Sequence, residues 1–284
     1  MDEPILFENY YNISTDNYCD NPVLSIPLGV NEQGVLEQVE ITDKPWQHIL
    51  VAGHCGSGKS NYLHTVLGSV LLNYSAEQVD MWLSDGGMCE FTRFADNAPA
   101  HIKRVNTSSD SASYIAFVDA LEKEITSRLK YLADVEKTSF YSWRCDSGKY
   151  PLPRLIVMID GFDHFVRCLF DTNHHYVEKM EHIVRRASTC GIIFIVSIQE
   201  ALFLAQHISR SFFELFGIRI ATKQSPDSYA VLFGVPTVAM EHNLILGDAI
   251  VNTPTIRKVE LLYLNTQVER QIIDRIIAIP YETL

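Results

Sequence analysis

The stretch HILVAGHCGSGKSNYL, residues 48–63, decides the fold of this 284-residue chain. It begins with an apolar run that ends in glycine, which is typical of a buried strand. The segment GHCGSGKS then fits the pattern G-x-x-x-x-G-K-[ST], and apolar residues recur at helical spacing across 60–74. A strand, a glycine-rich turn and a helix in this order predict a loop that binds phosphate groups.

Each position of this loop has a physical task. Glycines let consecutive amide N–H groups turn toward an anion, and the following helix adds its positive N-terminal end. Lys59 is expected to place its charge on the β- and γ-phosphates, and Ser60 to offer a hydroxyl to Mg²⁺, while Cys55 contributes its backbone. ATP and Mg²⁺ are therefore the expected cofactors. The expected nucleotide-binding residues are Gly53, Cys55, Gly56, Ser57, Gly58, Lys59 and Ser60.

A second acidic element follows the apolar run 155–160. Asp160 ends this run, and we expect it to hold the Mg²⁺ shell together with Ser60, although an aspartate here could instead cap a helix or form a turn. The next residue is Gly161, which can neither position nor deprotonate a water molecule. Because general-base catalysis contributes roughly 10²–10⁴ in rate, hydrolysis is expected to be slow. Asp163 is a candidate substitute base, with a capping carboxylate as the alternative.

The remaining chain alternates apolar strands with helices. Such alternation predicts an α/β fold with a mostly parallel, twisted sheet covered by helices on both faces. A polar loop is expected over 137–150. The expected strands are 23–28, 36–41, 48–53, 79–84, 155–160, 191–197, 217–221, 249–251 and 258–264, and the expected helices are 60–74, about 111–135 and 175–188.

Charge is unevenly distributed along the chain. The 35 acidic and 23 basic residues give a net charge of −12, which argues against a general basic surface for nucleic acid. Residues 1–45 carry nine carboxylates and one lysine, so 46–284 retain only −4. We therefore expect an acidic lead-in, 1–45, whose short strands pack on a core domain, 46–284. The charge of that core does not decide between nucleic acid and protein as a partner.

Composition also bears on location. The six cysteines form no C-x-x-C pair, which indicates reduced thiols rather than a disulfide framework. Neither a secretory signal nor a run of about 18 apolar residues is present. A cytoplasmic location is expected, with any membrane contact made through another domain or subunit.

Several motifs in this order resemble the FtsK/SpoIIIE family, over about 26–264. They are SDGGMCEF at 84–91, LPRLIVMIDGF at 152–162 and RRASTCGIIFIVSIQ at 185–199, together with the phosphate loop. The resemblance implies a RecA-like P-loop NTPase domain over 46–284 that assembles as a ring, a hexamer in this family, or as tandem ATPase modules. It also implies that Gln199 is a polar sensor with a catalytic role beside Asp160.

Departures from the family pattern point to weakened catalysis. Gly161 replaces the usual glutamate, and Gly86 and Gly87 stand where a basic residue is expected after Asp85 in the DNA translocases. Glu200 and Tyr229 stand where arginines are usual. Two functions stay open. The first is a motor that drives DNA through a ring, which is favoured by the number of such family members. The alternative is a degenerate ATPase module of a type VII-like secretion system, with weak or no hydrolysis and a secreted protein as cargo.

An arginine finger from a neighbouring subunit is a further possibility in such a ring. Arg185, Arg186 and Arg219 are the candidates, and the alternative for each is an ordinary structural or surface arginine.

Overall fold

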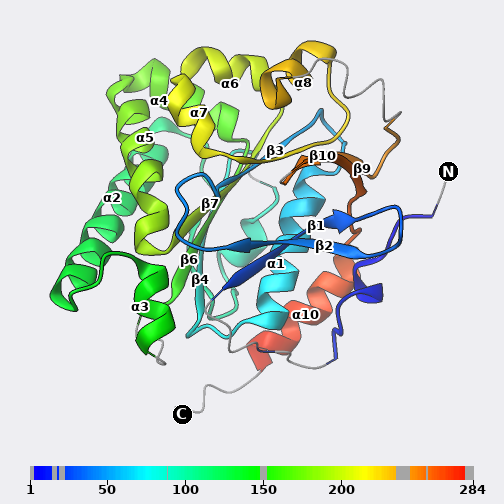
Figure 1. Cartoon of the computed structure of the whole chain (residues 1–284), viewed down its shortest axis with the longest axis horizontal. Coiled ribbons are helices and arrows are strands. Elements are labelled where there is room, and N and C mark those ends of the chain that lie inside the picture. The colour runs from blue at the N-terminus through cyan, green and yellow to red at the C-terminus, as the bar shows by residue number, and fades with distance from the viewer. Residues whose placement is uncertain are drawn as a thin grey trace.

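The fold is built around one mixed sheet, seen in the computed structural model of Figure 1, which describes residues 3–14, 18, 23–87, 89–147, 152–234, 244–253 and 255–278. In this part of the chain the sheet has ten strands in the order β2-β1-β10-β9-β8-β3-β7-β6-β4-β5. The expected α/β architecture with a mostly parallel sheet is confirmed.

Six strands form the parallel part of the sheet. They are β3 (Ile49–Ala52), β4 (Val79–Asp85), β5 (Ile102–Asn106), β6 (Arg154–Asp160), β7 (Ile192–Ile198) and β8 (Ile218–Ala221). An antiparallel extension continues from β8. Its strands are β9 (Asp248–Asn252), β10 (Ile256–Glu260), β1 (Leu24–Val30) and β2 (Leu36–Ile41). Residues 24–41 of the acidic lead-in are therefore strands of the same sheet.

Helices cover both faces of the sheet, as Figure 1 shows. On one face lie α1 (Lys59–Asn73) and α10 (Thr266–Ala278), and the other face carries α2 (Ser111–Asp134), α4 (Phe162–Asn173) and α5 (His175–Ala187). The short helices are α3 (Phe140–Ser147), α6 (Ala201–His207), α7 (Arg210–Leu215) and α8 (Pro226–Phe233), and the 3₁₀ turns are η1 (Phe7–Asn9), η2 (Thr92–Phe94) and η3 (Ser188–Cys190).

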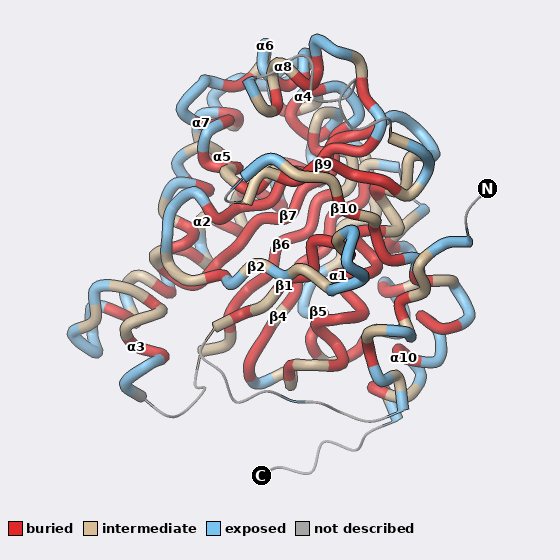
Figure 2. The backbone as a smooth tube through the Cα atoms, turned by 45° about the vertical axis from the view of Figure 1, so that its right-hand side comes forward, coloured by how far each residue is buried: buried red, intermediate tan, exposed pale blue. Residues whose placement is uncertain are grey.

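Burial explains why the central strands are apolar at every position. In β3, Leu50 and Ala52 join the hydrophobic cluster beneath α2, α4 and α5. Ile49 and Val51 point the other way and join the cluster beneath α1 and α10. Because successive side chains of a strand alternate between faces, a strand covered on both faces must be apolar throughout. Figure 2 shows this continuous buried centre.

Two expectations about secondary structure were wrong. The loop expected at 137–150 contains α3, because Phe140 and Trp143 are buried and anchor a helical turn on the core; positions 148–150 lie outside the described residues. The strand expected at 258–264 stays in the sheet only to Glu260. Helices α4, α6, α7, α8 and α10 were not anticipated. None of the helices in the described ranges is both long enough and apolar enough to cross a membrane.

Candidate functional site

The carboxyl ends of β3, β6 and β7 open into one cavity of about 780 Å³. Parallel α/β sheets bind ligands at this edge, where the loops after the strands converge. Nine of the ten residues proposed for the site line the cavity, and Gly53 is buried next to it. The lining residues proposed from the sequence are Cys55, Gly56, Ser57, Gly58, Lys59, Ser60, Asp160, Asp163 and Gln199.

The phosphate loop needs its glycines for two different reasons. Gly56 and Gly58 have φ values of 73° and 98°, in the left-handed region that disfavours side chains. Gly53 is constrained by space instead, since a Cβ there would lie 1.9 Å from Oγ1 of Thr222 and 2.3 Å from Oγ of Ser57. The Thr222 hydroxyl donates to Ser57 Oγ at 2.8 Å, so the end of β8 is attached directly to the loop.

Lys59 begins α1 and is only 8% exposed. Its Nζ donates to the carbonyl oxygen of His54, within the loop, at 2.9 Å. Burial lowers the pKa of the ammonium, and the carboxylate of Asp160 opposes that shift. The lysine is thus held within a loop whose backbone and helix terminus both favour anions.

Asp160 ends β6 and is bound to the neighbouring strand β7. The hydroxyl of Ser197 donates to its Oδ1, and the Gly161 N–H donates to Ser197 Oγ at 2.9 Å. Burial raises the pKa of Asp160, while the hydrogen bond from Ser197 acts in the opposite direction. Ser197 was not proposed as a site residue; its one signal in the sequence is a polar side chain within an apolar strand.

The residues present fit Mg²⁺ by their donor chemistry. Mg²⁺ prefers oxygen ligands and is commonly held by one or two protein groups together with substrate phosphates. The hydroxyl of Ser60 and the carboxylate of Asp160 line the same cavity as the phosphate loop. Together they would hold the ion beside the phosphates of a bound nucleotide.

Asp163 and Gln199 meet at the end of β7. One carboxylate oxygen of Asp163, Oδ2, accepts the N–H groups of Gln199 at 3.0 Å and of Glu200 at 3.3 Å. The backbone carbonyl of Gln199 accepts the side-chain amide of Gln224 at 3.4 Å. Asp163 therefore caps the turn before α6 while it lines the cavity, which is the capping alternative that the sequence left open.

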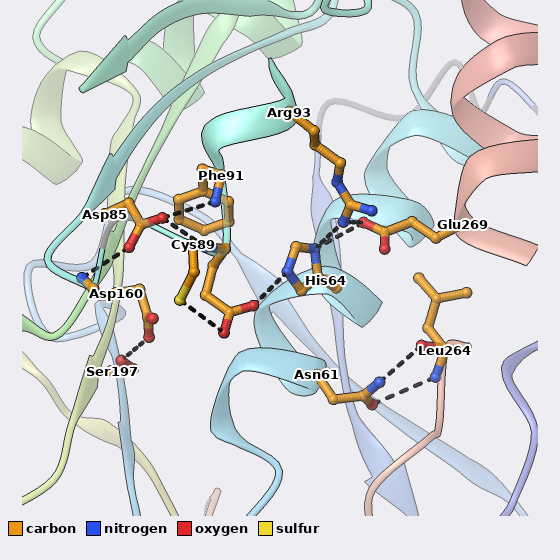
Figure 3. A network of polar contacts seen from close by, with 12 residues as sticks. Asn61, His64, Asp85, Cys89, Phe91, Arg93, Asp160, Ser197, Leu264 and Glu269 are labelled. Atoms are coloured by element: carbon orange, nitrogen blue, oxygen red, sulfur yellow. Dashed lines mark hydrogen bonds and ion pairs between the residues drawn. The ribbon is translucent and has the colours of Figure 1, made fainter. Parts of the chain in front are cut away.

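The segment after β4 is organised by Asp85, which is fully buried. Its Oδ1 accepts the N–H of Gly87 at 2.9 Å, and its Oδ2 accepts those of Glu90 at 2.6 Å and Phe91 at 2.9 Å (Figure 3). These bonds fold the chain back so that Glu90 lines the cavity. The hydrogen bond with His64, at 3.2 Å, lowers the pKa of Glu90 against the effect of its burial.

The three candidate arginines all have partners within their own chain. Arg219 donates to the carbonyl oxygens of Phe216 at 2.8 Å and Leu232 at 2.7 Å. Arg185 and Arg186 form ion pairs with Glu181 at 2.6 Å and with Glu122 at 2.8 Å, respectively. Their role as arginine fingers stays a prediction. Arg167 also lines the cavity, although the sequence did not single it out.

A glycine-rich loop between β3 and α1, with an acidic residue at the end of a parallel strand, defines a RecA-like P-loop ATPase domain. A family model described as the FtsK/SpoIIIE family matches residues 11–228. The chain therefore belongs to the FtsK/SpoIIIE family, and the resemblance noted in the sequence is confirmed.

Sequence relatives and structural relatives carry different names. The DNA translocase FtsK of Lactococcus lactis subsp. cremoris is 31% identical over 183 residues, covering 62% of this chain and 24% of the relative. The chain thus spans about a quarter of that protein. The cytoplasmic domain of the Thermomonospora curvata type VII secretion ATPase EccC superposes with a TM-score of 0.76 at 20% identity, over 99% of this chain and 36% of that one.

A second solved structure has a similar fold. EssC (ATPases 2 and 3) from Geobacillus thermodenitrificans gives a TM-score of 0.73 at 15% identity, covering 97% of this chain and 51% of that chain. At such identities these likenesses describe the fold alone.

Proposed function

We propose that this domain binds ATP with Mg²⁺ in the cavity at the end of β3. The main observation is that Asp160, which lies 100 positions after Ser60 in the sequence, lines the same cavity as Lys59 and Ser60 of the phosphate loop. Bound ATP would supply the phosphates, and Mg²⁺ would neutralise part of their negative charge. Lys59 would balance their charge, Ser60 would offer its hydroxyl to the ion, and Asp160 would orient the ion's water ligands.

Hydrolysis slower than in a site with a glutamate at position 161 is the second part of the proposal. Gly161 has no side chain with which to orient water, and its φ of 71° lies in the left-handed region. A glutamate introduced at this position would add roughly 1–2 kcal/mol of backbone strain. Asp163 already accepts two backbone N–H groups through one oxygen, which restricts its freedom to act on a water molecule.

For the task that ATP drives, we propose translocation of DNA through a ring of such domains, in the cytoplasm. Support comes from the FtsK relatives, which are DNA translocases, although the chain covers only 24% of the L. lactis protein. The alternative is a degenerate module of a type VII-like protein secretion system. It is supported by the fold shared with EccC, whose superposed part is a cytoplasmic domain, and by the glycines at 86, 87 and 161.

Nucleotide binding is tested by stability. A ligand present at 100 times its Kd stabilises the folded protein by about 2.7 kcal/mol. We expect this gain in urea unfolding free energy with ATP and Mg²⁺, and its loss in Lys59→Ala. Equal unfolding free energies with and without nucleotide in the wild type would refute the proposed site.

The cargo is tested by DNA binding. Fluorescence anisotropy with labelled duplex DNA at low salt should show binding that weakens as salt rises, because phosphate contacts release counterions. An ATP-binding domain that shows no DNA binding at low salt would exclude the motor and leave the secretion module.

A further inference from the structure

The absence of a side chain at Gly161 raises the question of which group could orient a water molecule in this site. Four carboxylates line the cavity: Glu90, Asp160, Asp163 and Glu200. Asp160 is bound by Ser197 and is the proposed metal-shell residue. Asp163 caps the turn before α6, and Glu200 is exposed at the N-terminus of that helix. Glu90 is the remaining candidate.

Glu90 differs from the other three by its ion pair with His64 on α1, the helix that follows the phosphate loop. Glu90 lines the same cavity as Ser60, the residue proposed to bind Mg²⁺. Asp160, the proposed metal-shell residue, lines this cavity as well. Glu90 therefore shares its cavity with both residues that are proposed to hold Mg²⁺ beside the phosphates of a bound nucleotide.

The backbone of Glu90 is fixed independently of its side chain. Its N–H donates to Asp85 Oδ2 at 2.6 Å, and the next N–H, of Phe91, donates to the same oxygen at 2.9 Å. Asp85 is itself a fully buried residue of β4, whose neighbour β6 ends in Asp160. The carboxylate is thus supported from the strand beside the one that carries the metal-shell aspartate.

The side chain of Glu90 is held by a buried ionic cluster. His64 Nε2 lies 3.2 Å from Glu90 Oε2, and His64 Nδ1 lies 2.7 Å from Oε1 of Glu269 on α10. Arg93 forms an ion pair with the same Glu269 oxygen (Figure 3). His64 and Glu269 are 7% and 3% exposed. An imidazolium between two carboxylates fixes the orientation of the ring, and the ring fixes the carboxylate of Glu90.

The helix that carries His64 is attached to the C-terminal segment at a second point. Asn61 Nδ2 donates to the carbonyl oxygen of Leu264 at 2.8 Å, and its Oδ1 accepts the Leu264 N–H at 3.4 Å (Figure 3). Both Asn61 and His64 therefore tie α1 to the chain that leads into α10.

We infer that Glu90 is the carboxylate that orients the attacking water in this domain, with His64, Arg93 and Glu269 as positioning residues. This inference rests on the proposed function. Glu90 accepts a proton from the water as the water oxygen bonds to the γ-phosphorus. The bond from that phosphorus to the bridging oxygen of ADP breaks, and ADP leaves with the electron pair of that bond. Phosphate and ADP are the products, and Glu90 afterwards returns its proton to solvent.

The test separates hydrolysis from binding in Glu90→Gln, which keeps the size and hydrogen-bonding capacity of the side chain. We expect its kcat to fall roughly 10²–10⁴-fold, the contribution of a general base. The apparent Kd for ATP with Mg²⁺, obtained from the stabilisation that they give, should stay within about twofold of the wild-type value. Glu178→Gln is the matched control, because it makes the same change on an exposed carboxylate of α5 and should behave like wild type.

Two more variants address the supporting cluster. Glu90→Asp keeps the carboxylate on a shorter side chain. It should retain more activity than Glu90→Gln, and it serves as the second variant if Glu90→Gln is poorly folded. His64→Gln should lower kcat roughly 10–100-fold at unchanged KM, the usual cost of removing a support behind a functional group.

Distinct results would overturn the inference. Unchanged turnover in Glu90→Gln, or a comparable loss in Glu200→Gln, would assign the role to another group. Loss of nucleotide binding in Glu90→Gln would make Glu90 a part of the binding site. Wild-type binding without measurable turnover would show that no carboxylate here is a working base. Absence of binding in the wild type would instead refute the proposed function itself.

Discussion

The most direct physical test concerns the charge of His64. This side chain is 7% exposed and lies between Glu90 at 3.2 Å and Glu269 at 2.7 Å. Burial alone would lower its pKa, but the hydrogen bonds to the two carboxylates outweigh burial and raise the pKa to about 9. In the folded protein the imidazole is therefore protonated at neutral pH.

The shift fixes both the sign and the size of a pH effect. The unfolded chain loses the proton near pH 6.5, and the folded chain keeps it to about pH 9. The stability that His64 contributes is thus fully present below pH 6.5, the pKa in the unfolded chain, and is lost as the pH rises through about 9, the pKa in the folded protein. The difference between the pKa values of His64 in the folded and unfolded states corresponds to about 3 kcal/mol of unfolding free energy, at about 1.4 kcal/mol per pKa unit.

The assay is urea unfolding at pH values from about 6 to about 10, with wild type and His64→Gln measured side by side. The difference in unfolding free energy between them should shrink by about 3 kcal/mol over this range and then level off. His175→Gln is the matched control, since His175 pairs with Glu178 at the surface, where both side chains are more than half exposed. A wild-type advantage over His64→Gln that stays constant with pH would refute the reasoning.

Three further outcomes are expected. Burial lowers the pKa of His48 to about 4. The stability that this neutral ring contributes should therefore be present above about pH 6.5 and be lost as the pH falls toward 4. In urea unfolding, His48→Gln should show a smaller loss of unfolding free energy over this acid range. Gly53→Ala should abolish ATP-dependent stabilisation, because the new Cβ would lie 1.9 Å from Thr222 Oγ1; normal stabilisation would contradict this. Gly191→Ala should lower the melting temperature, since its Cβ would lie 2.3 Å from Phe140 Cγ on left-handed backbone, and an unchanged melting temperature would show that the ring can move aside.

Much of the fold was readable because its signals are local. The apolar runs that became β3, β4, β6 and β7 are continuous, since both faces of each strand are covered. The helix α3 was missed because its polar composition is typical of a loop. What makes it a helix is the burial of Phe140 and Trp143 against distant parts of the chain.

The site, like the fold, could be predicted from the sequence where its residues belong to a local pattern. The residues of the phosphate loop are consecutive, and Asp160 ends an apolar run, so local pattern was enough to propose them. Ser197, which binds Asp160, has no motif of its own. The sequence also could not choose between the two roles of Asp163, because the choice depends on the position of the Gln199 N–H at the end of another strand.

Local sequence was enough to predict the phosphate loop, the parallel strand–helix alternation and the family, because each depends on residues that are near one another in the chain. The contact of Glu269 on α10 with His64 and Arg93 depends instead on tertiary packing, since Arg93 and Glu269 are 176 positions apart in the sequence. Tertiary packing also placed Glu90 in the same cavity as Ser60. The physical reason is that a buried charge must have a partner, and which partner is available is settled only when distant segments pack together.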